Sequence, residues 1–316
     1  MTDDATTRRS STITVSGVRS PVIEAGPEGV AEAVLFVHGN PGSSTDWTAL
    51  VDAVGPLARA VALDMPGFGK SETPRDWSYH VGAYAEFLEG ARKELGLERV
   101  HLVVHDFGGP FGLFWGLQHP EAWASVTLIN VGVLPGYTWH KMARRWRTPV
   151  LGELVQAWIP RSAWRSAMQR SNPKGLPPEF VDKMYDDYDR GTRRAVLKLY
   201  RATPDPGNAA QLVGEAIARL HKPALVVWGA KDPFLGVEYA ERQHEFFDVR
   251  DLVILEGSGH WPFQDDPESV KRALLAFLTA QLGAGRAGGR FSSSPGASAE
   301  APAEPAAEEA TRTGPR

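Results

Sequence analysis

Short apolar segments recur along the chain and predict a set of buried strands. These segments are Val34–His38, Ala60–Asp64, Val100–Val104, Val126–Asn130, Ala224–Trp228 and Leu252–Leu255. Most are apolar at nearly every position, which is typical of strands covered on both faces of a parallel sheet. Segments of helical length separate them, namely Thr45–Gly55, Tyr79–Gly96, Gly109–His119, Val237–Phe247 and Pro267–Leu282. The alternation predicts an α/β fold with a mostly parallel central sheet and helices on both of its faces.

One long interval, residues 133–220, breaks this alternation. It contains no good strand pattern but several helix-like stretches rich in Trp, Arg and Tyr. We expect a helical cap here, inserted into the core after the strand that ends near Asn130. The α/β core then consists of residues 20–132 and 221–283.

The two ends of the chain differ in composition from the rest. Residues 284–316 contain small, charged and polar residues and proline, with Phe291 as the one large apolar side chain. Such a segment cannot bury enough apolar surface to offset the entropy that it would lose on ordering. We therefore expect a disordered C-terminal tail over residues 284–316. We also expect an N-terminal extension over residues 1–19 that is partly disordered, at residues 1–10.

Composition excludes several classes of function. The 316 residues include no cysteine, so a disulfide scaffold, a thiolate metal site and a cysteine nucleophile are excluded. The formal net charge is only −4, which gives no overall electrostatic case for a nucleic-acid or membrane partner. No apolar run approaches the roughly 20 residues that span a bilayer. The first ten residues lack the apolar stretch of a secretory signal, so we expect a cytoplasmic protein.

The densest chemical motif is LVVHDFGG, residues 102–109. A buried strand that leads through a glycine-rich turn into a helix is the context of a nucleophile elbow, and Asp106 occupies the nucleophile position. A carboxylate attacks an sp³ carbon and forms an alkyl-enzyme ester, which water must then hydrolyse. Taken alone, Asp106 would equally suit the role of a helix cap.

Two later strand ends supply the partners that this chemistry needs. Asp232 follows the strand Ala224–Trp228, and His260 lies on a glycine-flanked loop after Leu252–Leu255. The order nucleophile, acid, histidine is that of an α/β-hydrolase triad. We expect His260 to activate the hydrolytic water and Asp232 to orient the imidazole ring.

A turn upstream completes the expected site. The sequence VHGNPG, residues 37–42, follows a buried strand and would face the nucleophile. We expect Asn40 and the backbone N–H of Phe107 to donate to an oxyanion there. His38 is expected to hold the loop, and Asn40–Pro41 is a candidate for a cis peptide bond.

With these residues in place, residues ~20–283 resemble the α/β-hydrolase family. The aspartate at the elbow is similar to the branch that holds epoxide hydrolases and haloalkane dehalogenases. The resemblance implies a hydrolase that acts on a small-molecule substrate through an ester intermediate. We expect no cofactor, no metal and no nucleic-acid or membrane partner.

The resemblance implies two ways to handle the leaving group. Dehalogenases of this family usually place a halide-binding Trp beside the nucleophile, where this chain has Phe107, although Asn40 matches their upstream turn. Epoxide hydrolases usually use two cap tyrosines, and Leu199–Arg201 matches the second of these at Tyr200. Tyr137 is the candidate for the first, with Tyr185 and Tyr188 as further candidates. We therefore favour epoxide hydrolysis, with dehalogenation as the alternative.

Two points bear on substrate and partners. Phe107 and Pro110 stand where fluoroacetate-type relatives place arginines, so we expect a neutral, fairly apolar substrate. The many cap arginines, such as those at 144, 145 and 147, favour a solvated helix surface over a docking site for an acidic partner.

A different class of function is a further alternative. A protein of this fold can bind a ligand without catalysis, or can catalyse a cofactorless reaction in which the elbow residue is not a nucleophile.

Overall fold

An eight-stranded sheet forms the centre of the structure, a computed structural model that describes residues 7–288. The strands lie in the order β1-β2-β4-β3-β5-β6-β7-β8. Only the β1–β2 and β2–β4 pairs are antiparallel, and all other pairs are parallel. The strand bounds are β1 Arg9–Val15, β2 Val18–Ala25, β3 Glu32–Val37, β4 Arg59–Leu63, β5 Arg99–His105, β6 Trp123–Ile129, β7 Pro223–Gly229 and β8 Asp248–Leu255.

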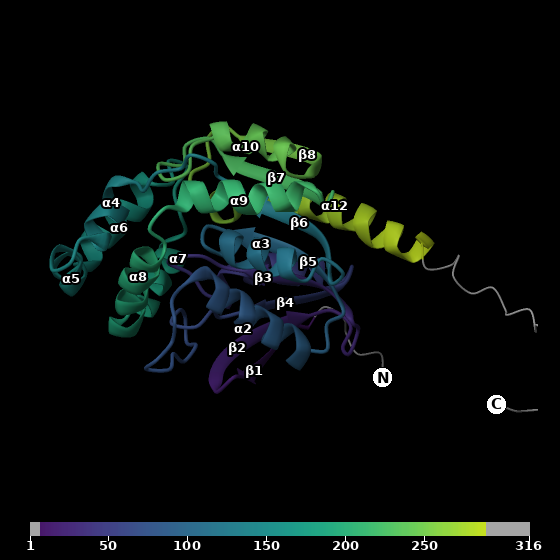
Figure 1. Cartoon of the computed structure of the whole chain (residues 1–316), viewed down its shortest axis with the longest axis horizontal. Coiled ribbons are helices and arrows are strands. Elements are labelled where there is room, and N and C mark those ends of the chain that lie inside the picture. The colour runs from purple at the N-terminus through teal and green to yellow at the C-terminus, as the bar shows by residue number, and fades with distance from the viewer. Residues whose placement is uncertain (1–6, 289–316) are drawn as a thin grey trace, which may run out of the picture.

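Helices cover both faces of this sheet (Figure 1). Helices α2 and α3 pack side by side on one face, and α1 and α12 pack together on the other. The core helices are α1 Thr48–Val54, α2 Val81–Glu94, α3 Gly108–Gln118, α10 Glu238–Arg242, α11 Pro262–Asp265 and α12 Pro267–Gly288. Short 3-10 helices span Ser44–Trp47 and Gln243–Glu245. The fold is the α/β arrangement that the sequence predicts.

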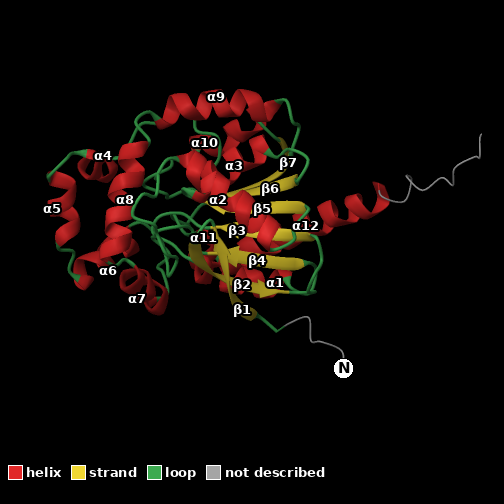
Figure 2. Ribbon diagram, turned by 60° about the horizontal axis from the view of Figure 1, so that its bottom comes forward, coloured by secondary structure: helices red, strands yellow, loops and turns green. Residues whose placement is uncertain are grey.

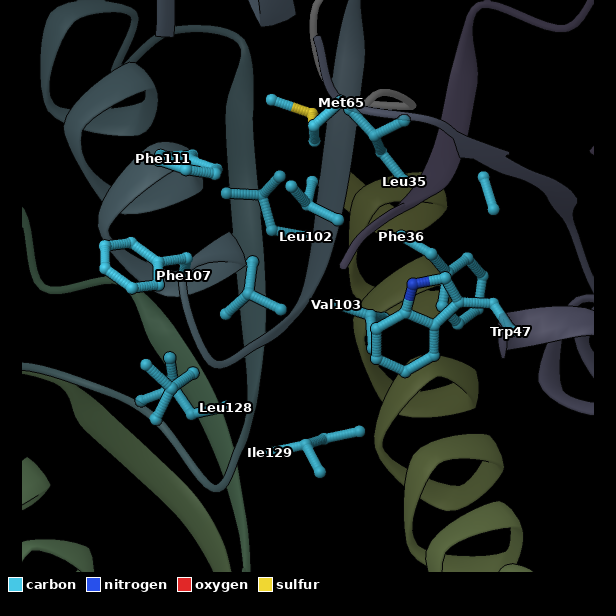
Figure 3. Packing of buried hydrophobic residues seen from close by; sticks show 14 of the residues in the cluster. Leu35, Phe36, Trp47, Met65, Leu102, Val103, Phe107, Phe111, Leu128 and Ile129 are labelled. Carbon is cyan, nitrogen blue, oxygen red and sulfur yellow. The ribbon is translucent and has the colours of Figure 1, made fainter. Parts of the chain in front are cut away.

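Strand β5 shows why the strands are apolar at successive positions. A Cβ at Gly112 of α3 would lie 3.4 Å from the Leu102 side chain, which shows that α3 packs directly over Leu102. Successive side chains of a strand point to opposite faces, so Val103 points toward Trp47 and helix α12 (Figure 3). Leu102 and Val103 are 1% and 0% exposed, which confirms that both faces of β5 are covered.

The N-terminal segment adopts more structure than the sequence analysis expected. Arg9 and Ser10, expected to be disordered, belong to β1, which forms a hairpin with β2 through Ser16 and Gly17. Only Ile13 and Val15 of β1 are buried, because this edge strand exposes its other face to solvent. An edge hairpin therefore lacks the continuous apolar run that marks the inner strands. Residues 1–6 and 289–316, which include most of the expected C-terminal tail, lie outside the described residues.

Six helices between β6 and β7 form the cap. The first five gather at one end of the molecule, beyond the ends of the strands, whereas α9 runs back alongside the core and contacts α3 (Figures 1 and 2). Within this interval the structure has no strand, as the sequence predicts. The helices are α4 Lys141–Arg147, α5 Leu151–Ala157, α6 Arg161–Arg170, α7 Pro178–Asp187, α8 Arg190–Ala202 and α9 Pro206–Ala218.

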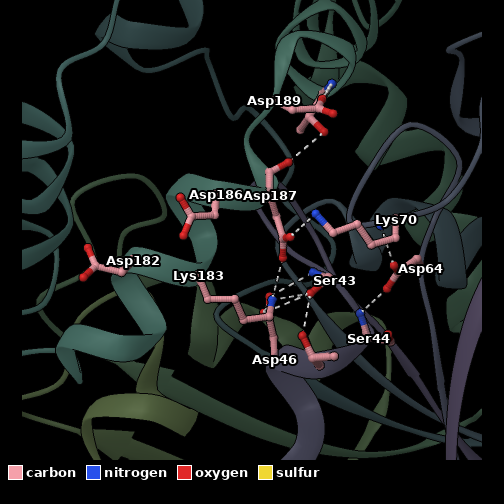
Figure 4. A network of polar contacts seen from close by, with 12 residues as sticks. Ser43, Ser44, Asp46, Asp64, Lys70, Asp182, Lys183, Asp186, Asp187 and Asp189 are labelled. Carbon is pink, nitrogen blue, oxygen red and sulfur yellow. Dashed lines mark hydrogen bonds and ion pairs between the residues drawn. The ribbon is translucent and has the colours of Figure 1, made fainter. Parts of the chain in front are cut away.

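A network of charged groups connects cap helix α7 to the core (Figure 4). The Lys183 ammonium group donates to Ser43 Oγ at 2.6 Å, and lies 3.2 Å from Asp46 Oδ1 and 2.9 Å from Asp187 Oδ2. Lys70 of the core contacts the other oxygen of Asp187 at 2.8 Å. Burial raises the pKa of Asp46, and Lys183 opposes that rise. Lys183 therefore neutralises a buried core carboxylate from the cap.

We predict that Lys183→Met lowers the free energy of unfolding by about 1–3 kcal/mol, because it leaves Asp46 buried without its cation. This expected loss is smaller than the loss for breaking a fully buried ion pair, because the Lys183 side chain is 34% exposed. Urea unfolding at neutral pH checks this. Lys141→Met is the matched control, since Lys141 is exposed and forms no salt bridge with a described residue. Equal stabilities of the two variants would contradict the role of Lys183.

Candidate active site

The turn after β5 holds Asp106 in a strained conformation. Its φ is +49°, in the left-handed region that non-glycine residues seldom adopt. Two glycines make room for this turn. A Cβ at Gly39 would lie 2.4 Å from the Asp106 side chain, and a Cβ at Gly108 would lie 2.1 Å from the carbonyl oxygen of Val37. The close approach of these segments raises the Asp106 carboxylate above the sheet, as a nucleophile elbow requires.

The Asp106 carboxylate has two partners. The backbone N–H of Asn40 donates to Oδ1 at 2.7 Å, and His260 Nε2 lies 3.6 Å from Oδ2. Burial by itself would raise the pKa of Asp106, but His260 and the Asn40 N–H outweigh it and hold this pKa below its usual value. The carboxylate is therefore ionised at neutral pH, which is the form that can act as a nucleophile.

His260 lies between Asp106 and a second carboxylate. Its Nδ1 donates to Asp232 Oδ2 at 2.6 Å. The other oxygen of Asp232 accepts from the backbone N–H groups of Phe234 at 2.7 Å and Leu235 at 3.1 Å. Burial lowers the pKa of His260, but the two carboxylates raise it to about 10. The three residues expected from the sequence thus meet in one hydrogen-bonded and ion-paired group.

Two residues that the sequence analysis did not single out support this group. Asn130, at φ +44°, donates from Nδ2 to Asp232 Oδ2 at 2.8 Å and accepts from the Gly229 N–H at 2.8 Å. His105 Nε2 donates to the carbonyl oxygen of His260 at 2.7 Å. Burial lowers the pKa of His105 to about 3, so its ring is neutral. Each is a polar residue at the end of a buried strand, and that position could have identified it.

A cavity of about 770 Å³ lies between the core and the cap, directly above Asp106. Most of its lining is apolar, as a neutral substrate would require. The described polar groups that line it include Asp106, His260, Asn40, Tyr137, Tyr200 and His140. The side-chain amide of Asn40 forms no hydrogen bond with any described residue. The cavity therefore brings together Asp106, His260, Asn40, Phe107, Tyr137 and Tyr200. Asp232 lies behind it and contacts the site through His260.

Both candidate tyrosines line this cavity. Tyr200 is 3% exposed, and burial together with the Asp106 charge raises its pKa well above the usual value. The same two causes raise the pKa of Tyr137. Of the two further candidates, Tyr188 also lines the cavity, and its hydroxyl accepts a hydrogen bond from Gln156. Tyr185 does not line it, and its hydroxyl donates to the carbonyl of Ile159. Tyr200 and Tyr137 thus remain protonated beside the carboxylate at neutral pH.

Phe107 packs against the cap rather than offering a side-chain donor. Its ring centroid lies 5.0 Å from that of Tyr200 and 6.0 Å from that of Trp139. The Trp139 N–H donates to the carbonyl of Thr203 at 3.1 Å and so points to the backbone. Phe107 therefore contributes an apolar side chain to the cavity lining.

The upstream turn has the structure that the sequence predicts. His38 Nε2 accepts from the Met65 N–H at 2.9 Å, and its Nδ1 donates to the Gly39 carbonyl at 2.8 Å. Both ring nitrogens are therefore used to hold the loop. The Asn40–Pro41 peptide bond is cis.

Two further observations concern the described part of the chain. No group of three or more His, Cys, Asp or Glu side chains there is placed to hold a metal ion. None of its helices combines the length and the apolar character needed to cross a membrane.

Comparison with known proteins assigns the family. A family model described as the alpha/beta hydrolase fold matches residues 32–267. The chain belongs to this family, and it is a hydrolase.

Two of the similar proteins are named as a haloalkane dehalogenase and an epoxide hydrolase. A haloalkane dehalogenase of Bradyrhizobium diazoefficiens is 26% identical over 279 residues, 78% of this chain and 87% of the relative. Epoxide hydrolase 3 of Mus musculus is 24% identical over 285 residues, 85% of this chain and 76% of the relative. The crystal structure of a haloalkane dehalogenase from Bradyrhizobium elkani superposes with a TM-score of 0.75 at 22% identity, covering 88% and 100% of the two chains. This last likeness shows the shared fold.

We predict that His260→Gln raises the pKa of Asp106. In the wild type His260 opposes the effect of burial, so removing its charge leaves burial dominant and moves this pKa above about 3.9, the usual value. A ¹³C NMR titration of the labelled Asp106 carboxyl checks both proteins. Asp266, which pairs with Lys174, is the internal control and keeps its lowered pKa. An Asp106 pKa equal in the two proteins would contradict the pairing.

Proposed function

We propose that this hydrolase is an epoxide hydrolase that uses Asp106 as a covalent nucleophile. The observation that carries the proposal is the shared cavity, in which the ionised Asp106 faces the same space as the protonated phenol of Tyr200. Opening an epoxide needs both a nucleophile and a proton donor for the departing oxygen. Phe107 offers no side-chain N–H for a halide, which also favours this choice.

In the first half-reaction, an Asp106 oxygen attacks an epoxide carbon. The new ester C–O bond forms as the ring C–O bond breaks, and the electron pair goes to the ring oxygen. That oxygen takes the proton of Tyr200, because an alkoxide is a stronger base than a phenolate. Tyr137 donates a second hydrogen bond to the ring oxygen.

In the second half-reaction, water hydrolyses the ester. Ester formation removes the charge of Asp106, so one of the two carboxylates that raise the pKa of His260 is lost. His260 then gives its proton back to the Tyr200 phenolate through solvent and can act as a base. His260 Nε2 takes a proton from water, and hydroxide attacks the ester carbonyl. The backbone N–H groups of Asn40 and Phe107 stabilise the oxyanion, and collapse releases the diol and regenerates the ionised Asp106.

The substrate class follows from the cavity. Its apolar lining and volume of about 770 Å³ suit a neutral molecule with a sizeable hydrocarbon part. No arginine stands next to Asp106 to bind a carboxylate, because the neighbouring positions are Phe107 and Pro110. We therefore propose a bulky apolar epoxide, such as an aryl or long-chain alkyl epoxide.

One observation favours haloalkane dehalogenation as the second candidate. The side-chain amide of Asn40 and the indole N–H of Trp146 both border the cavity, and neither has a hydrogen-bond partner among the described residues. Two free N–H donors near a carboxylate could hold a departing halide. The relative from Bradyrhizobium diazoefficiens is named for that activity. A protein that only binds a ligand in this cavity is a third reading, which turnover of either substrate class would exclude.

We predict that His260→Gln accumulates the alkyl-enzyme ester. Without its base, Asp106 is alkylated but hydrolysis stalls, so the intact mass rises after incubation with an aryl epoxide. The gain equals the mass of the whole epoxide if the ring is opened. If incubation with a haloalkane instead raises the intact mass by the mass of that haloalkane minus HX, dehalogenation is the activity.

The control for this trap is Asp106→Ala combined with His260→Gln, which has no nucleophile and gains no mass. If the wild type turns over the epoxide but His260→Gln remains unmodified, the covalent mechanism is wrong. If the wild type turns over neither substrate class, the ligand-binding reading is favoured.

We predict that Tyr200→Phe slows alkylation by epoxides by roughly a hundredfold or more, because the departing oxygen loses its proton donor. Alkylation by a bromoalkane, whose leaving group needs no proton, changes much less. Rapid-quench mass spectrometry of the trapped ester measures both rates. Tyr185→Phe is the matched control, since Tyr185 does not line the cavity and its hydroxyl donates to the backbone carbonyl of Ile159. An equal loss for both substrates would contradict the role of Tyr200 as a proton donor.

A further inference from the structure

Exposed apolar side chains are concentrated at the outer end of the cap. Among the described residues, seven large apolar side chains are exposed, and five of these lie between residues 142 and 158. Val150, Leu154 and Trp158 are 69%, 67% and 80% exposed, and Leu151 is 43% exposed. We call these four residues the α5 patch. Large apolar side chains clustered on a protein surface mark a site that contacts something other than water.

Helix α5 is apolar on two opposite faces. Gly152, Val155, Gln156 and Ile159 follow one another at helical spacing, and these positions are buried or half-buried toward the inside of the cap. Val155 and Ile159 line the cavity. The α5 patch is the exposed face of this helix. Helix α5 itself lies at the end of the molecule farthest from the sheet (Figures 1 and 2). An amphipathic helix ordinarily directs polar residues to solvent, and the apolar side chains on the exposed face of α5 depart from this rule.

The backbone at Val150 is a separate observation on the same surface. Its φ is +68°, a conformation that is costly for a β-branched residue. The Val150 side chain is exposed and is not part of the hydrophobic core. Glycine would relieve the strain without losing a core contact. The apolar side chain is thus kept at a cost to stability, which indicates a role outside the fold.

Positive charge lies beside the α5 patch, on the adjacent α4. Residues 141–170 contain seven lysines and arginines but a single acid, Glu153, and that acid pairs with Arg201. Arg161 and Arg165 of α6 pair with Asp182 and Asp186 of α7. Lys141, Arg144 and Arg145 of the adjacent α4 are exposed and form no salt bridge with a described residue. A second copy docked symmetrically on this surface would bring these cations close to one another, and their repulsion disfavours a dimer. Apolar side chains with an exposed Trp, next to the free cations of α4, complement an anionic lipid surface.

We propose that the outer end of the cap, formed by α4 and the α5 patch, docks on anionic lipid membranes. The patch enters the interfacial region, and Lys141, Arg144 and Arg145 contact the lipid phosphates. Met142 of α4 and Ala163 of α6 are both exposed and border the cavity, so the cavity reaches the surface in this part of the cap. An apolar substrate dissolved in the bilayer would have a short path to it. The proposal departs from the sequence-based expectation of no membrane partner, because the overall charge of −4 conceals this local cluster.

Co-sedimentation of the full chain with lipid vesicles tests the proposal without reference to catalysis. We expect binding to vesicles of equal parts phosphatidylcholine and phosphatidylglycerol, little binding to phosphatidylcholine alone, and loss of binding in molar salt. The double variant Leu154→Glu with Trp158→Glu abolishes binding. Arg144→Gln with Arg145→Gln weakens it by about tenfold. Leu212→Glu, at a 63% exposed leucine on α9, is the matched control and binds as the wild type does.

Val150→Gly keeps the test decisive if the charged variants fail to fold. It relieves the backbone strain, so we expect an equal or higher melting temperature together with weaker vesicle binding. The proposal is overturned if the wild type does not bind the anionic vesicles, or if the α5 patch variants bind them as the wild type does. It is also overturned if sedimentation equilibrium shows a wild-type dimer that these variants dissociate, since the patch would then contact a second copy.

Discussion

The close approach of three chain segments around Asp106 is the constraint on which the rest of the site depends. The loop after β3, the end of β5 and the start of α3 meet where a Cβ at Gly39 or Gly108 would overlap its neighbours. This packing keeps Asp106 at a positive φ and aims its carboxylate at the cavity. It also places the Asn40 N–H on the carboxylate oxygen that would become an oxyanion. Backbone geometry and chemistry are thus set by the same contacts.

Burial and charge act against each other throughout the site. Burial alone would favour a neutral Asp106 and a neutral His260, yet their mutual attraction, with Asp232, keeps both charged. In the proposed mechanism this balance changes when Asp106 forms an ester, because His260 then loses one of its two anionic partners. The same residues can therefore first keep Asp106 ionised as a nucleophile and afterwards allow His260 to act as a base. Asn130 maintains the arrangement by holding Asp232 in place.

The parallel part of the fold and the triad could be predicted because local patterns determine them. Asp106 and Asp232 follow buried, continuously apolar strands, and His260 follows the apolar end of β8, a half-buried edge strand. All three strands are parallel, so the meeting of these residues at one edge of the sheet follows from topology. The edge hairpin was missed because β1 buries only Ile13 and Val15. The positions of cap side chains such as Tyr200, and the exposed face of α5, depend on how helices pack together. No short sequence pattern encodes that packing.

Oxygen transfer in a single turnover tests the covalent role of Asp106 most directly. The enzyme, in excess over an aryl epoxide, reacts once in ¹⁸O-labelled water, and mass spectrometry locates the label. The account predicts an unlabelled diol and one ¹⁸O atom in the peptide that contains Asp106, because the oxygen given to the substrate comes from the carboxylate. A labelled diol from the first turnover, with unlabelled Asp106, would show direct attack by water and contradict the account.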